Sequence, residues 1–185
     1  MSMAQDESDL ENFLDAGPAD ASKLMGAYLN PVIEGLSYGF NGGWYTTAKA
    51  HKTFGFDISA SFNAVFIPSS KNYFRPADLN LQVTQLVSPA SGNSPTIAGP
   101  PDPTNYEVDI NNDNRPEGTF EGPEGLDFKE TFKVSGVLAP TAQIGLGIYK
   151  NTDLKVRWIP EVDFGDSKIK LLGFGVMHDI KQHIP

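Results

Sequence analysis

The stretch Phe54–Phe66 constrains the fold of this chain most strongly. Its even positions are all apolar, and its odd positions are polar or glycine until Val65 breaks the pattern. A period of two over this length predicts a β-strand with one apolar and one polar face. Soluble strands usually run about 5–6 residues, whereas a strand that crosses a membrane needs about 9–11. The first question is therefore whether the apolar face meets a protein core or lipid.

Composition excludes several classes of function. The net charge of -9 argues against a nucleic-acid partner, whose phosphates require a basic surface. Cysteine is absent, which excludes disulfides, thiolate catalysis and cysteine metal sites. No apolar window reaches the length of a membrane helix, but this leaves a β-barrel open because each of its strands gives a weak hydropathy signal.

The N-terminal part is predicted to be helical. We expect residues 1–8 to be an appended or disordered start, and residues 9–35 to form a helical plug or cap. Gly17-Pro18 is expected to break the helix, and Asn30-Pro31 to end it. The first residues lack the basic start and apolar run of a secretory signal. Either the protein is cytoplasmic, or the sequence begins after the place of a signal peptide.

From Leu36 the period changes to two, and residues 36–185 are predicted to be β-strands. Leu36–Tyr45 is expected to form a hairpin with Phe54–Phe66. Further strands are expected at residues 78–87, 126–138, 143–149, 154–158 and 168–180. Residues 88–125 are rich in Pro, Gly and acid and lack periodicity, so they predict a long loop of functional or disordered character. The fold class predicted is all-β, an antiparallel up-and-down meander of about seven or more strands with a short N-terminal helical segment.

Two interpretations of the alternation remain open. An outer-membrane barrel, or part of one, places apolar residues against lipid and polar residues in its lumen. A soluble barrel or sandwich that binds an apolar ligand or a protein partner reverses these faces, and a structural barrel without a solute is a third option. In the membrane interpretation the following residues line the lumen and tune selectivity: Asp57, Ser59, Asn63, Gln143, Lys155 and Arg157.

Other candidate sites are weaker. Asp109, Asn111 and Asp113 have the spacing of calcium ligands. The loop lacks the glycine at its sixth position and has Phe120 where the final acid would stand. His178 and Asp179 are neighbours in a predicted strand, so their side chains point to opposite faces. We therefore expect no enzyme activity, no cofactor and no resident metal.

Three stretches resemble an uncharacterised family of predicted outer-membrane barrels from Bacteroidota, known as a domain of unknown function. They are Leu24–Pro31, Asn41–Lys49 leading into Gly55-Phe56-Asp57, and Lys168–Gln182. That family is distantly similar to the long-chain fatty-acid transporter barrels, in which a helical hatch with an Asn-Pro-Ala motif plugs the barrel. Here Val32 follows Asn30-Pro31.

The resemblance implies an outer-membrane location in a Gram-negative bacterium, lipid or detergent as the surroundings, and passage or binding of small hydrophobic molecules. It also implies a plug that includes Leu24, Tyr28, Asn30 and Pro31. Members of that family continue with more strands, so this chain is expected to be a truncated part of a barrel or to close through a partner or an oligomer, since an open sheet leaves two unpaired edges.

Overall fold

A computed structural model describes residues 12–131, 133, 135–164 and 167–184. The chain divides into two compact units. The first comprises Met1–Gly35 with Phe66–Val137, and the second comprises Leu36–Val65 with Leu138–Pro185. The expectation for residues 1–8 lies outside the described residues.

A long helix, α2 (Gly17–Asn41), follows the 3-10 helix η1 (Asn12–Ala16), and the two meet at the predicted Gly17-Pro18 break. The prediction that Asn30-Pro31 ends the helix is wrong, because Pro31 lies inside α2. An apolar side chain at every fourth position is buried along one side of the helix: Leu24, Tyr28, Val32, Leu36 and Phe40. Burial of this stripe offsets the cost of about 3 kcal/mol that an interior proline imposes.

The four-residue spacing of buried side chains also shows that the first predicted strand begins as a helix. Leu36 and Phe40 are buried, whereas Tyr38 between them is 65% exposed. These residues therefore follow the spacing of a helix rather than the alternation of a strand. The prediction of a strand over Leu36–Tyr45 is wrong, because its first part belongs to α2 and residues 42–45 lie in turns, bends and irregular backbone; the hairpin predicted from it is wrong as well.

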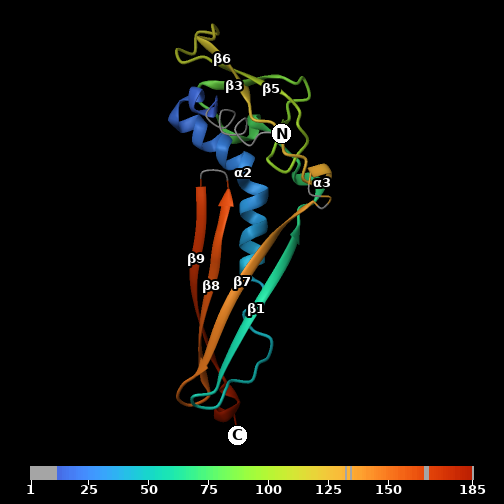
Figure 1. The fold of residues 1–185 in the computed structure, drawn as a ribbon. Helices are drawn as coiled ribbons and strands as arrows, with labels where there is room; N and C mark the ends of the chain where they lie inside the picture. Colours follow the sequence, from blue (N-terminus) through green and yellow to red (C-terminus); the bar gives the residue numbers. More distant parts are fainter. Residues whose placement is uncertain (1–11, 132, 134, 165–166, 185) are drawn as a thin grey trace. The chain divides into compact units, whose positions relative to one another are not determined.

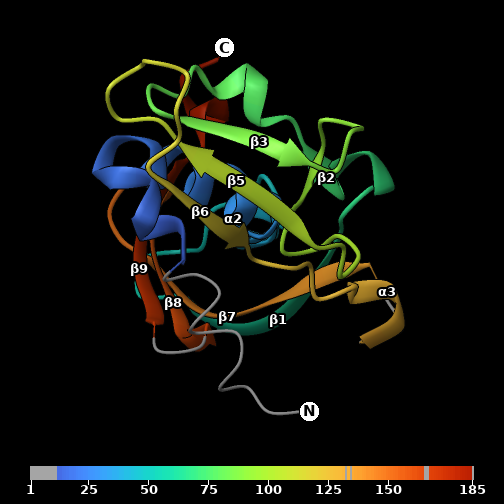
Figure 2. The ribbon, with the colours of Figure 1, turned by 90° about the horizontal axis from the view of Figure 1, so that it is seen from above.

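Two small antiparallel sheets build the first unit (Figure 2). One has the order β3-β5-β6, formed by β3 (Thr84–Ser88), β5 (Thr104–Val108) and β6 (Gly118–Gly122). The other pairs β2 (Tyr73–Phe74) with β4 (Ser94–Pro95). The short helices of this unit are η2 (Ser69–Lys71), η3 (Pro76–Leu79) and α3 (Phe128–Thr131). Its core includes Phe13, Leu24, Tyr28, Tyr106 and Phe120.

This unit corrects three sequence predictions. The strand expected at 126–138 is wrong, because α3 occupies Phe128–Thr131 and the strand β7 (Gly136–Gly147) begins only at Gly136. The segment 88–125, expected to be a loop, contains β4, β5 and β6. Tyr106 and Phe120 hold it together, because both are buried and their rings stack with centroids 5.1 Å apart. The strand expected at 78–87 begins only at Thr84, since the preceding residues form η3 and Asn80 adopts a left-handed backbone with a φ of 51°.

A four-stranded sheet with the order β1-β7-β8-β9 dominates the second unit (Figure 1). Its strands are β1 (Phe56–Phe66), β7 (Gly136–Gly147), β8 (Thr152–Phe164) and β9 (Ser167–His178), and η4 (Ile180–His183) follows. β8 pairs antiparallel with both β7 and β9. The turn expected before β8 forms at Lys150 and Asn151, both with positive φ.

The predicted fold class is confirmed: the strands form antiparallel sheets, preceded by an N-terminal helical segment. β7, β8 and β9 follow one another in the predicted meander, whereas β1 pairs with β7, which is distant in the sequence. The described strands form open sheets and no closed barrel. Among the described helices, none is long and apolar enough to cross a membrane.

Candidate functional site

One face of the four-stranded sheet is apolar and exposed. Strand register places Ile144, Val156 and Phe174 in one row across β7, β8 and β9, and Phe174 is 75% exposed. We define the apolar face by its exposed side chains: Phe56, Ile58, Phe62, Phe66, Ile144, Leu146, Leu154, Val156, Trp158, Leu172, Phe174 and Val176. The largest apolar patch of a typical soluble monomer covers about 300–600 Å², and a single large aromatic side chain offers about 150–250 Å². The apolar face therefore exceeds what a soluble monomer usually exposes.

The opposite face of the same sheet is polar and buried. Gln143, Arg157 and Gly173 form one row, with Gly145, Lys155 and Gly175 as the next. Exposure falls to 1% at Arg157 and 7% at Lys155. We call this the polar face. The sheet thus inverts the arrangement of a soluble protein, in which charged side chains are almost never fully buried unless paired.

Two segments of the chain cover the polar face. One is the end of α2, and the other is residues 42–54, which we call the strap. Trp44 of the strap lies against β9 at two glycines. A Cβ atom built on Gly173 would lie 2.8 Å from the Trp44 ring, and one on Gly175 would lie 3.0 Å from it. The Tyr45 hydroxyl donates to the Val176 carbonyl of β9 at 3.0 Å. Glycines on this face thus provide the room in which the strap packs.

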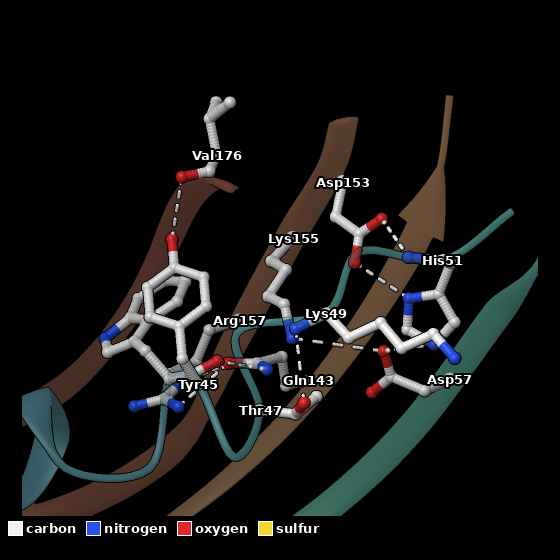
Figure 3. Close-up of polar contacts among 11 residues, drawn as sticks. Tyr45, Thr47, Lys49, His51, Asp57, Gln143, Asp153, Lys155, Arg157 and Val176 are labelled. Carbon is white, nitrogen blue, oxygen red and sulfur yellow. Dashed lines mark hydrogen bonds and ion pairs between the residues drawn. The ribbon is translucent and has the colours of Figure 1, made fainter. Parts of the chain in front are cut away.

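Arg157 joins three parts of the second unit (Figure 3). Its Nε and Nη2 donate to Gln143 Oε1 at 3.0 and 2.8 Å. Its Nη1 donates to the carbonyls of Phe40 and Gly42, each at 2.7 Å. The guanidinium also lies 4.2 Å from the centroid of the Trp44 ring. A cation therefore satisfies the carbonyls at the C-terminal end of α2, where the helix dipole favours positive charge.

A second polar cluster holds the far end of the strap (Figure 3). The buried carboxylate of Asp153 accepts from the His51 backbone N–H at 2.9 Å, and it lies 2.8 Å from His51 Nδ1. The other imidazole nitrogen lies 3.6 Å from Asp57 Oδ1. Lys155 Nζ is 4.0 Å from the same oxygen and 5.3 Å from the centroid of the Tyr45 ring. His51 is thus held between two carboxylates from different strands.

Most of the predicted lumen residues lie on the polar face. Gln143 and Arg157 bind each other, and Asp57 is an ion-pair partner of Lys155. Asn63 donates to the Gly39 carbonyl of α2 at 2.8 Å. Beside it, the hydroxyls of Ser61 and Thr141 are 2.7 Å apart. Ser59 is exposed.

Sequence reasoning missed His51, Asp153, Trp44 and Tyr45. Asp153 carried a usable signal, since it continues the odd-numbered series of Lys155 and Arg157 along one face of a strand. His51 carried none, because a segment without periodicity does not reveal what it packs against. Trp44 and Tyr45 were assigned to the strand predicted over Leu36–Tyr45, which does not form.

The predicted plug residues lie elsewhere. Leu24 and Tyr28 are buried in the core of the first unit, where the Tyr28 hydroxyl donates to the Glu124 carbonyl at 2.9 Å. Asn30 and Pro31 line an open groove of about 460 Å³ beside Lys71. The residues that cover the polar face of the sheet are those of the strap and the end of α2.

The calcium candidate is only partly assembled. Asp109, Asp113 and Glu117 bring carboxylate oxygens within 4.8 Å of one another. Asn111 instead donates to Glu117, and the Asp109 carboxylate accepts backbone N–H groups of Asp113 and Asn114. Hydrogen bonding within the loop accounts for this arrangement.

His178 and Asp179 take separate roles, although not through strand alternation, because β9 ends at His178 and Asp179 precedes η4. His178 Nδ1 lies 2.8 Å from the Thr152 hydroxyl. The Asp179 carboxylate accepts the Lys181 backbone N–H at 2.9 Å and thereby caps η4.

Comparison with known proteins places the chain in one family. No curated protein matches it, and no solved structure matches it. A family of unknown function, DUF6588, matches residues 1–185. The predicted resemblance to an uncharacterised domain is therefore confirmed, and the chain belongs to the DUF6588 family of unknown function.

Proposed function

We propose that the four-stranded sheet is part of the wall of an outer-membrane β-barrel, with its apolar face against lipid and its polar face toward the interior. The observation that carries this proposal is that the polar face of the sheet is buried and its apolar face is exposed. Arg157 and Lys155 are buried, while Val156 and Trp158, which alternate with them along β8, are exposed. Apolar residues facing lipid and polar residues facing a lumen are the pattern of membrane barrels.

Strand length supports the same function. β1, β7, β8 and β9 contain 11, 12, 13 and 12 residues. A membrane-spanning strand needs about 9–11 residues, so each of the four is long enough to cross a bilayer. Soluble strands average about 5–6 residues, as β3, β5 and β6 of the first unit do with 5 each.

The strap acts in this proposal as an inner lining of the barrel wall. Backbone and side-chain polar groups have no water to bind in the hydrocarbon layer, so they must be satisfied within the protein. The contacts of Arg157 with Gln143, Phe40 and Gly42 do this on the polar face. The strap thereby fills part of the barrel interior on the polar face of these strands.

Four antiparallel strands cannot enclose a lumen, because the smallest membrane barrels have about 8 strands. The edges of the sheet at β1 and β9 are where further strands would pair. In our proposal these strands come from other parts of the protein, from a partner or from further copies of the chain.

The resemblance to predicted Bacteroidota barrels, and through them to fatty-acid transporter barrels, supports a solute class. We propose that the barrel passes or binds small hydrophobic molecules and has no enzymatic activity. Uptake of a fluorescent long-chain fatty acid into proteoliposomes that hold the closed barrel tests this part. Uptake above that of protein-free liposomes is expected, and equal uptake by both would contradict the transport proposal.

Detergent dependence tests the membrane part. The purified chain is followed by far-UV circular dichroism and sedimentation, with and without micelles. We expect aggregation in plain buffer and β-structure with a single sedimenting species in detergent. A monodisperse, β-rich protein in plain buffer would contradict the proposal and favour the soluble binding module.

A further inference from the structure

Two histidines at the end of β9 face each other. His178 is the last residue of β9 and His183 the last residue of η4. Their Nε2 atoms are 3.3 Å apart, a hydrogen-bond distance at which one ring donates to the other, while their ring centroids are 5.5 Å apart. Since the Nε2 atoms are closer than the ring centres, each ring turns its Nε2 toward the other.

This separation is the one that a tetrahedral metal ion imposes. Zn²⁺ binds histidine nitrogens at about 2.0–2.1 Å, and a tetrahedral angle between two such bonds places the nitrogens about 3.3–3.4 Å apart. Imidazole is a preferred ligand of zinc, copper and nickel. We propose that His178 and His183 bind a divalent transition-metal ion, for which Zn²⁺ is the probe.

A neighbouring hydroxyl orients the first ligand. Thr152 is the register partner of His178 on β8, and its Oγ1 lies 2.8 Å from His178 Nδ1. The same hydroxyl donates to the Lys150 carbonyl at 3.4 Å, and in the tautomer that the proposal requires its oxygen accepts the Nδ1–H of His178. The Nε2 lone pair of His178 then points toward His183. Metal-ligating histidines commonly have their second ring nitrogen held in this way.

The second ligand is positioned by η4. The Asp179 carboxylate accepts the Lys181 backbone N–H at 2.9 Å and fixes the start of this short helix, and the Ile184 backbone N–H donates to the Lys181 carbonyl at 3.3 Å at its end. Both histidines are exposed, so the metal enters from solvent, and water completes its coordination. This site is separate from the polar face and does not depend on the proposed membrane function.

Titration of the full chain with Zn²⁺, in competition with a chromophoric chelator, tests the proposal. We expect one Zn²⁺ per chain, and a loss of affinity of about tenfold or more in His183→Gln and in His178→Gln. Thr152→Val is expected to weaken binding less, because it removes only the orienting contact. Co²⁺ is expected to give visible absorption of a tetrahedral site, which His183→Gln abolishes.

Asp113→Asn is the matched control, because it removes a carboxylate from the acidic loop and leaves the histidine pair intact. Its Zn²⁺ affinity should equal that of the unaltered chain. Equal Zn²⁺ affinity in His183→Gln and the unaltered chain would overturn the proposal, and so would a loss caused by Asp113→Asn alone. His183 lies on exposed η4, so its variant tests the site even where His178→Gln disturbs the strand.

Discussion

Trp44 and Trp158 lie on opposite faces of the same sheet. Trp158 is on the apolar face and is 53% exposed. Trp44 belongs to the strap and lies on the polar face, with the guanidinium of Arg157 4.2 Å from its ring centroid. They are the only 2 tryptophans of the chain. The two faces of the proposed barrel wall thus each carry one tryptophan.

Phe174→Arg is expected to block membrane insertion. Phe174 lies in the row of Ile144 and Val156, and an arginine facing lipid at the bilayer midplane costs about 2–4 kcal/mol. Insertion into liposomes is measured by flotation. Ile110→Arg is the control, since Ile110 is 64% exposed but belongs to the first unit. Equal flotation of both variants would argue against lipid contact at Phe174.

Arg157→Ala is expected to loosen the strap. Each buried polar group left unsatisfied costs about 1–3 kcal/mol, and this variant removes the partner of Gln143 and of two carbonyls. Trypsin should then cleave at Lys49 and Lys52 faster than in the unaltered chain. Lysine at this position should rescue only in part, because it lacks the planar fork of arginine.

The control for the strap is Arg115→Ala, which removes an exposed arginine of the first unit. Its cleavage rate at Lys49 and Lys52 should match the unaltered chain. Unchanged cleavage in Arg157→Ala would show that the strap does not depend on this side chain.

Gly173→Ala is expected to displace Trp44. The added methyl group would lie 2.8 Å from the indole ring, which is too close for either group to stay in place. The Trp44 fluorescence should shift in a Trp158→Phe background. Gly118→Ala is the control, because a Cβ at that strand glycine meets no atom within 4 Å. An unshifted spectrum in Gly173→Ala would contradict the packing of Trp44 on β9.

Asp20 should make the first unit sensitive to acid. Burial alone would raise its pKa, but hydrogen bonds from the backbone N–H groups of Val83, Gln82 and Thr84 and from the Thr84 side chain outweigh burial and lower the pKa. Because the folded pKa is depressed, the stabilisation is present above the unfolded pKa of about 3.9 and is lost as pH falls through the folded value.

Asp20→Asn should therefore reduce the free energy of unfolding at pH 7 by about 1–3 kcal/mol, and by less in strong acid. Urea unfolding at both pH values measures the difference. Asp15→Asn alters an exposed carboxyl on η1 and serves as the control. A loss that is the same at both pH values would contradict the role of the ionised carboxylate.

Local alternation was enough to predict the faces of the strands. Asp57, Gln143 and Arg157 were assigned to one face from their odd positions alone, and the structure brings them to the polar face. The period of two fixes which side chains share a face, and β1, the best alternating stretch, was the best predicted strand.

What covers that face could not be predicted. Trp44 was assigned to a strand that does not form, and His51 lies in a segment without periodicity. Their partners Arg157 and Asp153 are more than a hundred residues away in the sequence. The helix across Pro31 was missed for a related reason. Leu36, Tyr38 and Phe40 alternate as in a strand, but Leu36 and Phe40 are also four residues apart, as on one side of a helix. Only their burial, with Tyr38 exposed, shows that the helical spacing applies.

The most direct test of the membrane wall uses the two tryptophans. Trp44→Phe leaves Trp158 as the only tryptophan, and Trp158→Phe leaves Trp44. Each variant is placed in liposomes whose lipids carry bromine on their acyl chains. The account predicts strong quenching of Trp158 and little quenching of Trp44. Trp158 emission that is unaffected by the brominated chains, or equal quenching of both residues, would contradict it.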